Sequence, residues 1–135
     1  MQLVPVATPE TPAFDQRISD AEGAAMARAT VNLFDRWDLT DAQARTLLGE
    51  VSPATYTRWK RGALPRLSVD LKTRLSTLMG IHKALRVLFS DNDRAYRWVK
   101  APNKTFGGKT ALEVMLGGAI TDLMRVRHYL DAERG

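Results

Sequence analysis

The sequence predicts an all-α protein. Apolar residues recur at a helical spacing of three and four residues, and no segment reads convincingly as a strand. Serine or threonine followed three residues later by glutamate or glutamine, the capping-box pattern that begins a helix, occurs at Ser19, Thr40 and Thr110. The chain has 135 residues, which suits one compact domain or two small ones that share a core.

Composition argues against several classes of protein. The chain holds no cysteine, so disulfides and thiolate metal sites are excluded, and a cytoplasmic location is expected. His82 and His128 lie far apart without ligand spacing, so no metal or other cofactor is expected. We expect no membrane span and no secretory signal, because the apolar runs are too short. No Ser-His-acid arrangement or suitable pair of carboxylates is evident, so we expect a protein that is not an enzyme.

The first part of the chain predicts an arm followed by two helices. Residues 1–18 are expected to form a flexible arm, because they contain three prolines and no helical period. The capping box at Ser19 then begins a helix that runs to about Trp37. A short helix begins at Thr40 and ends at Gly49, which can adopt the left-handed conformation that closes a helix.

A third helix follows almost at once. Ser52 is a favourable N-cap, and Pro53 suits the first helical position. Tyr56 and Trp59 are expected to face inward, and Gly62 ends the helix.

The segments 39–49 and 51–62 together have the design of a helix-turn-helix. A small residue, Ala44, lies where the two helices would cross, and a glycine marks the turn. The other face of the second helix is small and polar at its start and basic further on, which suits a major groove. Residues 51–69 hold four basic residues and no acidic one, out of a net charge of +5. Such a patch indicates a phosphate backbone, and a solvated helix face is the alternative.

The exposed residues of this helix divide into two groups by position. Base-edge contacts are expected from Pro53, Ala54, Thr55 and Thr57. Phosphate contacts are expected from Ser52, Arg58, Lys60 and Arg61. Pro53 and Ala54 have no side-chain donor, so sequence readout is expected from the other residues or from DNA shape. A helix-turn-helix kept only for packing is the alternative.

The second half of the chain predicts four more helices. A long connecting helix is expected over residues 68–90, and Gly80 is expected to bend it. Ser90 or Asp91 caps a shorter helix that is stopped by Pro102. Thr110 then begins a helix of barely two turns. The last helix starts near Ala119, with Ile120, Leu123, Met124 and Leu130 expected to face inward.

The string from Trp98 to Gly118 is the most distinctive part of the sequence. Gly107-Gly-Lys-Thr110 looks like the end of a P-loop, but a P-loop needs a further glycine where the chain has Asn103, after a buried strand. We interpret the string as a rigid recognition loop, with Phe106 buried beneath it and two glycines in torsions closed to other residues. The alternatives are an ordinary helix connection and an enzyme that uses the loop on phosphate.

Both segments resemble known families. The helix-turn-helix resembles the Xre/Cro type, in which a recognition helix of the form Ser-x-x-x-x-x-Arg-Trp-x-x-Gly is common, although Glu50 makes the turn one residue longer than usual. The later string is similar to the toxin-binding domain of Xre/MbcA/ParS antitoxins. It matches that signature at Trp98, Pro102, Asn103, Gly107, Gly108, Thr110, Leu112 and Glu113. It departs at Val99, Phe106 and Ala111, where the exchanges are apolar or compatible with a helix.

The resemblance implies an antitoxin of a type II toxin–antitoxin pair. It divides the chain into a helix-turn-helix region at 19–67, the connecting helix, and a toxin-binding domain at 91–135. The implied partner is a RES-domain toxin that consumes NAD+, whose active site the antitoxin blocks. The helix-turn-helix would bind operator DNA and repress the shared operon, as a homodimer within a larger complex, because palindromic operators mirror a two-fold axis.

The toxin-binding residues implied by the resemblance lie in the loop and at the C-terminal end. They are Trp98, Pro102, Asn103, Phe106, Gly107, Gly108, Lys109, Tyr129, Arg134 and Gly135. In this family the C-terminal end lies at the entrance to the toxin's active site, so Arg134 and the carboxylate of Gly135 are the expected plug. A frayed helix end is the alternative there. For the whole chain, the alternative is a stand-alone transcription or polar-localisation factor without a toxin.

Overall fold

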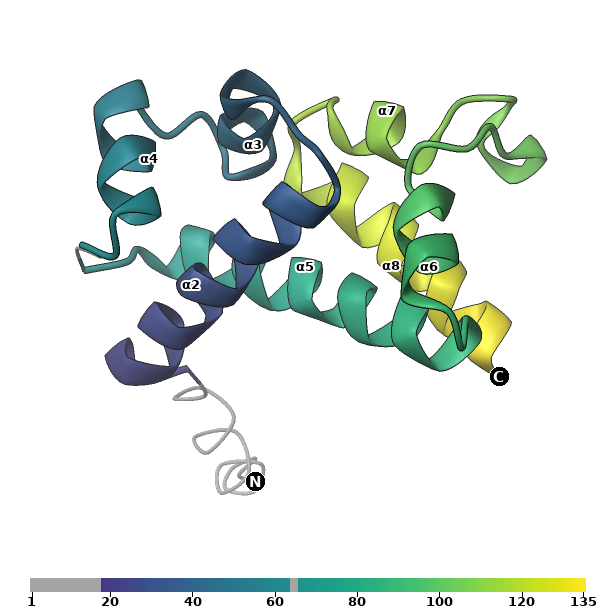
Figure 1. Cartoon of the computed structure of the whole chain (residues 1–135), viewed down its shortest axis with the longest axis horizontal. Helices are drawn as coiled ribbons and strands as arrows, with labels where there is room; N and C mark the ends of the chain where they lie inside the picture. Colours follow the sequence, from purple (N-terminus) through teal and green to yellow (C-terminus); the bar gives the residue numbers. More distant parts are fainter. Residues whose placement is uncertain (1–17, 64–65) are drawn as a thin grey trace, which may run out of the picture.

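The computed structural model describes residues 18–63 and 66–135, and these residues form an all-α fold (Figure 1). The α-helices are α2 (Asp20–Arg36), α3 (Asp41–Leu47), α4 (Pro53–Lys60), α5 (Val69–Leu88), α6 (Asn92–Trp98), α7 (Ala111–Met115) and α8 (Ile120–Arg134). A short 3-10 helix, Lys104–Phe106, lies between α6 and α7. The described residues contain no strand, only an isolated bridge between Pro102 and Thr110. The predicted fold class is therefore confirmed.

The predicted arm, residues 1–18, falls outside the described residues apart from Ile18. Within residues 18–63 and 66–135, none of the helices combines the length and the apolar character needed to cross a membrane.

Side chains close to each helix start fix the boundaries. All three predicted capping boxes are present, with Ser19, Thr40 and Thr110 as the N-caps. At Thr110, for example, the hydroxyl accepts the Glu113 N–H at 3.0 Å while the Thr110 N–H donates to the Glu113 carboxylate at 2.8 Å. Each box satisfies two donors that the first helical turn would otherwise leave without partners. Asp91, rather than Ser90, caps α6.

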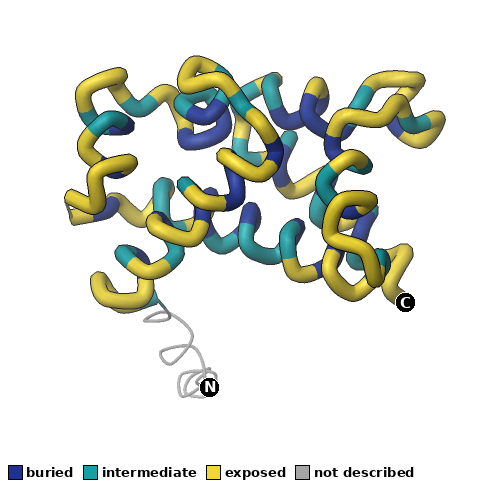
Figure 2. Tube along the Cα trace, viewed as in Figure 1, coloured by how far each residue is buried: buried dark blue, intermediate teal, exposed yellow. Residues whose placement is uncertain are grey.

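Helix α5 is shared by the two halves of the chain. In Figure 1, α2 crosses it on one side and α8 packs along it on another. Its fully buried apolar residues are Leu75, Leu78, Ile81, Ala84 and Leu85. Figure 2 shows the buried positions of α2, α5 and α8 turned toward one another. Because both halves bury apolar side chains against the same helix, the described residues share one core.

Gly80 permits the close approach of α8 to α5. The helix runs through this glycine from Val69 to Leu88. A Cβ at position 80 would lie 2.4 Å from Cζ of Arg127, whose Nε is 3.5 Å from the Asp131 carboxylate. The predicted bending glycine is thus a contact point where an arginine of α8 lies over the backbone of α5.

The inward face of α8 differs in one position from the prediction. Leu123 and Leu130 are fully buried as expected, and Ile120 is half-buried. Met124, however, is 36% exposed, and Val126 is fully buried in its place. Adjacent helical residues point about 100° apart, so Met124 follows Leu123 around to the edge of the helix. Val126 completes a spacing of three and four with its buried neighbours.

The turn between α3 and α4 uses two successive left-handed residues. Gly49 has a φ of 84° and Glu50 a φ of 70°. The buried Arg74 of α5 lies against this turn and donates from Nη1 to the Leu47 carbonyl at 3.2 Å. A Cβ on Gly49 would meet Arg74 Nε at 2.9 Å. The extra turn residue noted in the sequence, Glu50, is therefore accommodated, and α5 supports the turn from below.

Replacing Gly49 with alanine should destabilise the protein for two reasons. The left-handed backbone costs an ordinary residue about 1–2 kcal/mol, and the new methyl group must displace the pinned Arg74 side chain. Gly62→Ala is the matched control, because Gly62 has a φ of 90° but a Cβ added there would meet no atom within 4 Å. Urea unfolding should show the larger loss in Gly49→Ala, and equal losses would contradict the role assigned to Arg74.

Candidate functional site

Helix α4 presents an exposed face at one end of the molecule (Figure 1). Tyr56 and Trp59 are buried, as predicted, and hold the opposite face of α4 against the core. The exposed residues along the helix and its N-cap are Ser52, Pro53, Ala54, Arg58, Lys60 and Arg61, and Thr55 and Thr57 are half-buried. The structure thus brings together, on one short helix, every residue predicted to contact DNA.

A chain of hydrogen bonds organises the start of α4. The Ser52 hydroxyl accepts the Thr55 N–H at 3.1 Å and donates to Thr55 Oγ1 at 2.9 Å. Arg58 Nη2 also donates to Thr55 Oγ1, at 3.2 Å. Because Thr55 Oγ1 accepts both bonds, its own proton remains available for an acceptor on a partner. The three side chains are held in place before any ligand arrives.

Lys60 has a different environment from the two arginines. Its Nζ lies 2.7 Å from the Asp41 carboxylate at the start of α3, and 5.6 Å from the centre of the Tyr56 ring. Burial, with Asp41 and Asp35, raises the pKa of Tyr56 to about 12, so that the phenol stays neutral. A phosphate contact by Lys60 would therefore compete with Asp41. Among the described residues, neither Arg58 nor Arg61 forms an ion pair.

The glycine-containing loop is closed by its own backbone. The Asn103 N–H donates to the Lys109 carbonyl at 3.0 Å, and the Gly108 N–H donates to the Asn103 carbonyl at 3.0 Å. The Asn103 side chain accepts the Thr105 N–H at 2.9 Å. Gly107 and Gly108 have φ values of 68° and 90°, so the expected torsional role of the glycines is confirmed. The loop is a rigid projection.

Three aromatic side chains join this loop to the last helix. Trp98 and Tyr129 stack with ring centres 6.2 Å apart and an interplanar angle of 8°. Phe106 meets Tyr129 edge-on at 5.3 Å and Trp98 at 6.3 Å. Phe106 is buried, as predicted, whereas Trp98 and Tyr129 are half-buried. Three residues predicted as separate parts of a binding surface thus form one aromatic cluster.

Sequence reasoning missed one member of this site. The guanidinium carbon of Arg125 lies 5.4 Å from the centre of the Phe106 ring, within cation–π range. The available signal was its position four residues before Tyr129, which places both side chains on one face of α8.

The remaining predicted residues lie in two separate places. Pro102 and Lys109 are exposed on the loop. Arg134 and Gly135 are exposed at the end of α8, which Figure 1 shows away from the loop. Arg134 Nη1 is 3.7 Å from the Asp131 carboxylate, a long and exposed pair that holds the arginine weakly. The structure therefore does not join the end of α8 to the loop glycines.

Comparison with known proteins identifies the two halves. Residues 16–80 match the family model of the antitoxin Xre-like helix-turn-helix domain, and residues 84–135 match that of the antitoxin Xre/MbcA/ParS C-terminal toxin-binding domain. The chain belongs to the Xre/MbcA/ParS antitoxin family. The antitoxin is similar to the uncharacterized protein y4oB of Sinorhizobium fredii (strain NBRC 101917 / NGR234), with 42% identity over 113 residues, covering 82% of this chain and 85% of that protein.

The family assignment agrees with the geometry of both surfaces. A helix-turn-helix and a toxin-binding domain make this chain an antitoxin with a DNA-binding region. The two matches meet within α5, the helix shared by both halves. Within residues 18–63 and 66–135 there is no cluster of three or more histidines and carboxylates that could hold a metal ion.

One histidine of the antitoxin has a perturbed proton affinity. His82 is half-buried on α5 and lines a hollow together with Arg36 and Arg86. Burial, followed by the charges of Arg86 and Arg36, lowers the pKa of His82 below its usual value. The folded protein therefore prefers the neutral imidazole.

Acid should destabilise the antitoxin partly through His82. The unfolded chain takes up a proton near about pH 6.5, while the folded chain takes it up only at lower pH. Stability is therefore lost as pH falls from about 6.5 through the lowered folded pKa. Urea unfolding at several pH values should show a shallower pH dependence in His82→Gln than in the wild type. His128→Gln, at an exposed histidine of α8, is the control, and an unchanged slope in His82→Gln would refute the assignment.

Proposed function

We propose that this antitoxin neutralises a RES-domain toxin, an enzyme that consumes NAD+, by blocking its active site. The observation that carries the proposal is the aromatic cluster of Trp98, Phe106 and Tyr129, which fixes the loop of the toxin-binding domain against α8. A rigid surface loses little conformational freedom when a partner binds it. The resemblance of residues 98–113 to the family signature supports a toxin of the RES class.

We further propose that the end of α8 is the inhibitory element. Arg134 and Gly135 are exposed, and the weak pairing of Arg134 with Asp131 leaves the guanidinium available to a partner. An arginine suits an active-site entrance that offers acidic or polar groups, because its planar guanidinium donates several hydrogen bonds in a fixed geometry. On this proposal the loop and its aromatic cluster mainly support the fold and the interface, while α8 reaches the active site.

Co-expression with the product of the neighbouring gene tests toxin neutralisation. We expect the two proteins to purify together, and we expect NAD+ consumption by the neighbour to fall to background when the antitoxin is equimolar. Arg134→Glu should bind but inhibit poorly, whereas Glu133→Gln, at the adjacent exposed residue, should inhibit normally.

Two results would contradict this proposal in different ways. A neighbour that binds the antitoxin but retains full activity would rule out active-site blocking. A neighbour that does not bind would favour a stand-alone transcription or polar-localisation factor.

We also propose that the antitoxin acts in the cytoplasm as a homodimer that binds operator DNA and represses its own operon. The exposed face of α4 supports this, with base contacts from Pro53, Ala54, Thr55 and Thr57. Phosphate contacts would come from Ser52, Arg58, Lys60 and Arg61. The free proton of Thr55 and the unpaired state of Arg58 and Arg61 favour these three residues as the strongest contacts.

Removing two of the proposed phosphate contacts should weaken DNA binding and its salt dependence. For Arg58→Ala with Arg61→Ala, the slope of log K against log salt concentration should become shallower by about 1.8, at about 0.9 for each lost contact. Lys83→Ala with Lys104→Ala removes the same charge from exposed residues outside α4 and should leave the slope nearly unchanged. Titration of the promoter fragment at several salt concentrations measures both, and an equal slope in the two double variants would refute the assignment.

A further inference from the structure

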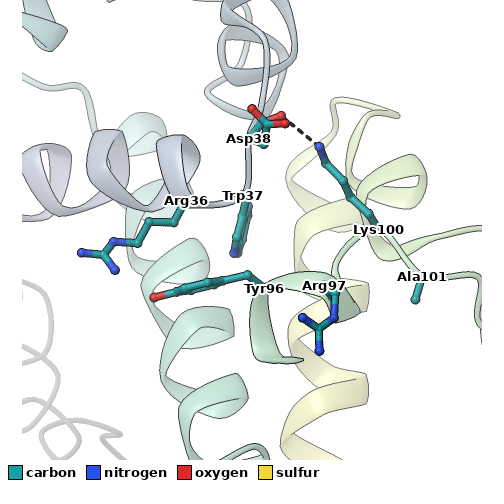
Figure 3. A pocket seen from close by; sticks show the side chains of 7 residues that line it. All are labelled: Arg36, Trp37, Asp38, Tyr96, Arg97, Lys100 and Ala101. Atoms are coloured by element: carbon teal, nitrogen blue, oxygen red, sulfur yellow. Dashed lines mark hydrogen bonds between the residues drawn. The ribbon is translucent and has the colours of Figure 1, made fainter. Parts of the chain in front are cut away.

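Two adjoining hollows lie between the end of α2, the second half of α5, and α6. The larger, of about 570 Å³, is lined in part by Arg36, Trp37, Tyr96, Arg97 and Lys100 (Figure 3). The smaller, of about 250 Å³, is lined in part by Asn32, Arg36, His82, Arg86 and Tyr96. Because Arg36 and Tyr96 line both hollows, we treat them as one surface, the Tyr96 groove.

The charge of the Tyr96 groove is strongly one-sided. Asp38 is the only carboxylate that lines either described hollow. Arg36, Arg86 and Arg97 are at least partly exposed, and none of them has an ion pair among the residues that the structure describes. The lowered pKa of His82 has the same origin, because Arg86 and Arg36 add to the effect of burial. The groove therefore holds cations whose charge the described residues leave uncompensated.

The groove also holds an unsatisfied hydrogen-bond donor. Trp37 is 2% exposed, and its Nε1 has no hydrogen-bond partner. Figure 3 shows the nitrogen edge of the indole directed toward Tyr96. A buried donor without an acceptor is unfavourable, so an acceptor reaching it past Tyr96 would be stabilising. The side-chain amides of Asn32 and Asn92 line the neighbouring hollow and could bond to peptide groups.

The shape and position of the groove favour a polypeptide over DNA. Figure 1 shows α6 and the DNA-binding helix α4 at separate ends of the molecule. The cations line hollows between helices, whereas a duplex contacts exposed faces along its backbone. Arg97 and Lys100 belong to the toxin-binding domain, residues 84–135.

From these features, we propose that the Tyr96 groove binds an acidic segment of the toxin, whose carboxylates pair with Arg36, Arg86 and Arg97. This inference rests on the proposed toxin partnership. It adds a second contact region to the loop and the end of α8. Lys100 is excluded from the main contacts, because its Nζ already donates to the Asp38 carbonyl at 2.9 Å.

A fluorescent peptide of alternating glutamate and serine tests the groove directly. Its anisotropy is measured with the whole antitoxin, with Arg36→Glu/Arg97→Glu, and with the control Arg28→Glu/Arg66→Glu. The control changes exposed arginines outside both hollows and alters net charge equally. We expect binding by the wild type, a loss of about ten-fold or more in the groove variant, and less than about two-fold in the control. Circular dichroism checks that both variants stay folded.

The same three proteins are then tested for capture of the toxin and for binding to the promoter fragment. The inference predicts that the groove variant loses toxin affinity while the control keeps it. Equal losses of peptide affinity in both variants, or no peptide binding by the wild type, would overturn it. So would a loss of DNA affinity in the groove variant, which would make the groove a phosphate surface. Toxin capture that is equal in all three proteins would reject the groove but retain the proposed function, whereas peptide binding without any toxin capture would reject that function.

Discussion

The burial of α5 between α2 and α8 is the interaction on which the rest of the structure depends. Its inner face holds Leu75, Leu78, Ile81 and Leu85, all without solvent contact or nearly so. Burying one such side chain contributes about 1.5–3 kcal/mol, so a helix that buries several on two sides can hold neighbours that are too short to be stable alone. Helices α3 and α7, of 7 and 5 residues, are such neighbours.

This shared core places the two binding regions on one scaffold. The turn before α4 rests on Arg74 of α5, and the glycine-containing loop is tied to α8 through Tyr129. Lys100 adds a direct bond from the toxin-binding domain to the Asp38 carbonyl at the end of α2. The antitoxin thus offers its DNA-binding and toxin-binding surfaces as parts of one body.

Local features of the fold could be predicted from the sequence, because their causes lie within a few residues. The capping boxes and the left-handed Gly49 and Gly107 depend on short-range hydrogen bonds and on steric limits. Contacts between distant segments could not be predicted. The stacking of Trp98 on Tyr129 and the meeting of Arg36 with Arg97 depend on how helices pack, which no local pattern specifies. The prediction for Met124 was wrong because periodicity alone does not define the edge of a buried face.

Native-state hydrogen exchange tests the shared core most directly. If α5 joins both halves into one cooperative unit, the slowest amides of α2, α5 and α8 exchange through the same opening, with a free energy equal to that of global unfolding. Slow exchange in α2 and α5 together with α8 amides that open at a clearly lower free energy would contradict the account, because the toxin-binding half would then unfold independently.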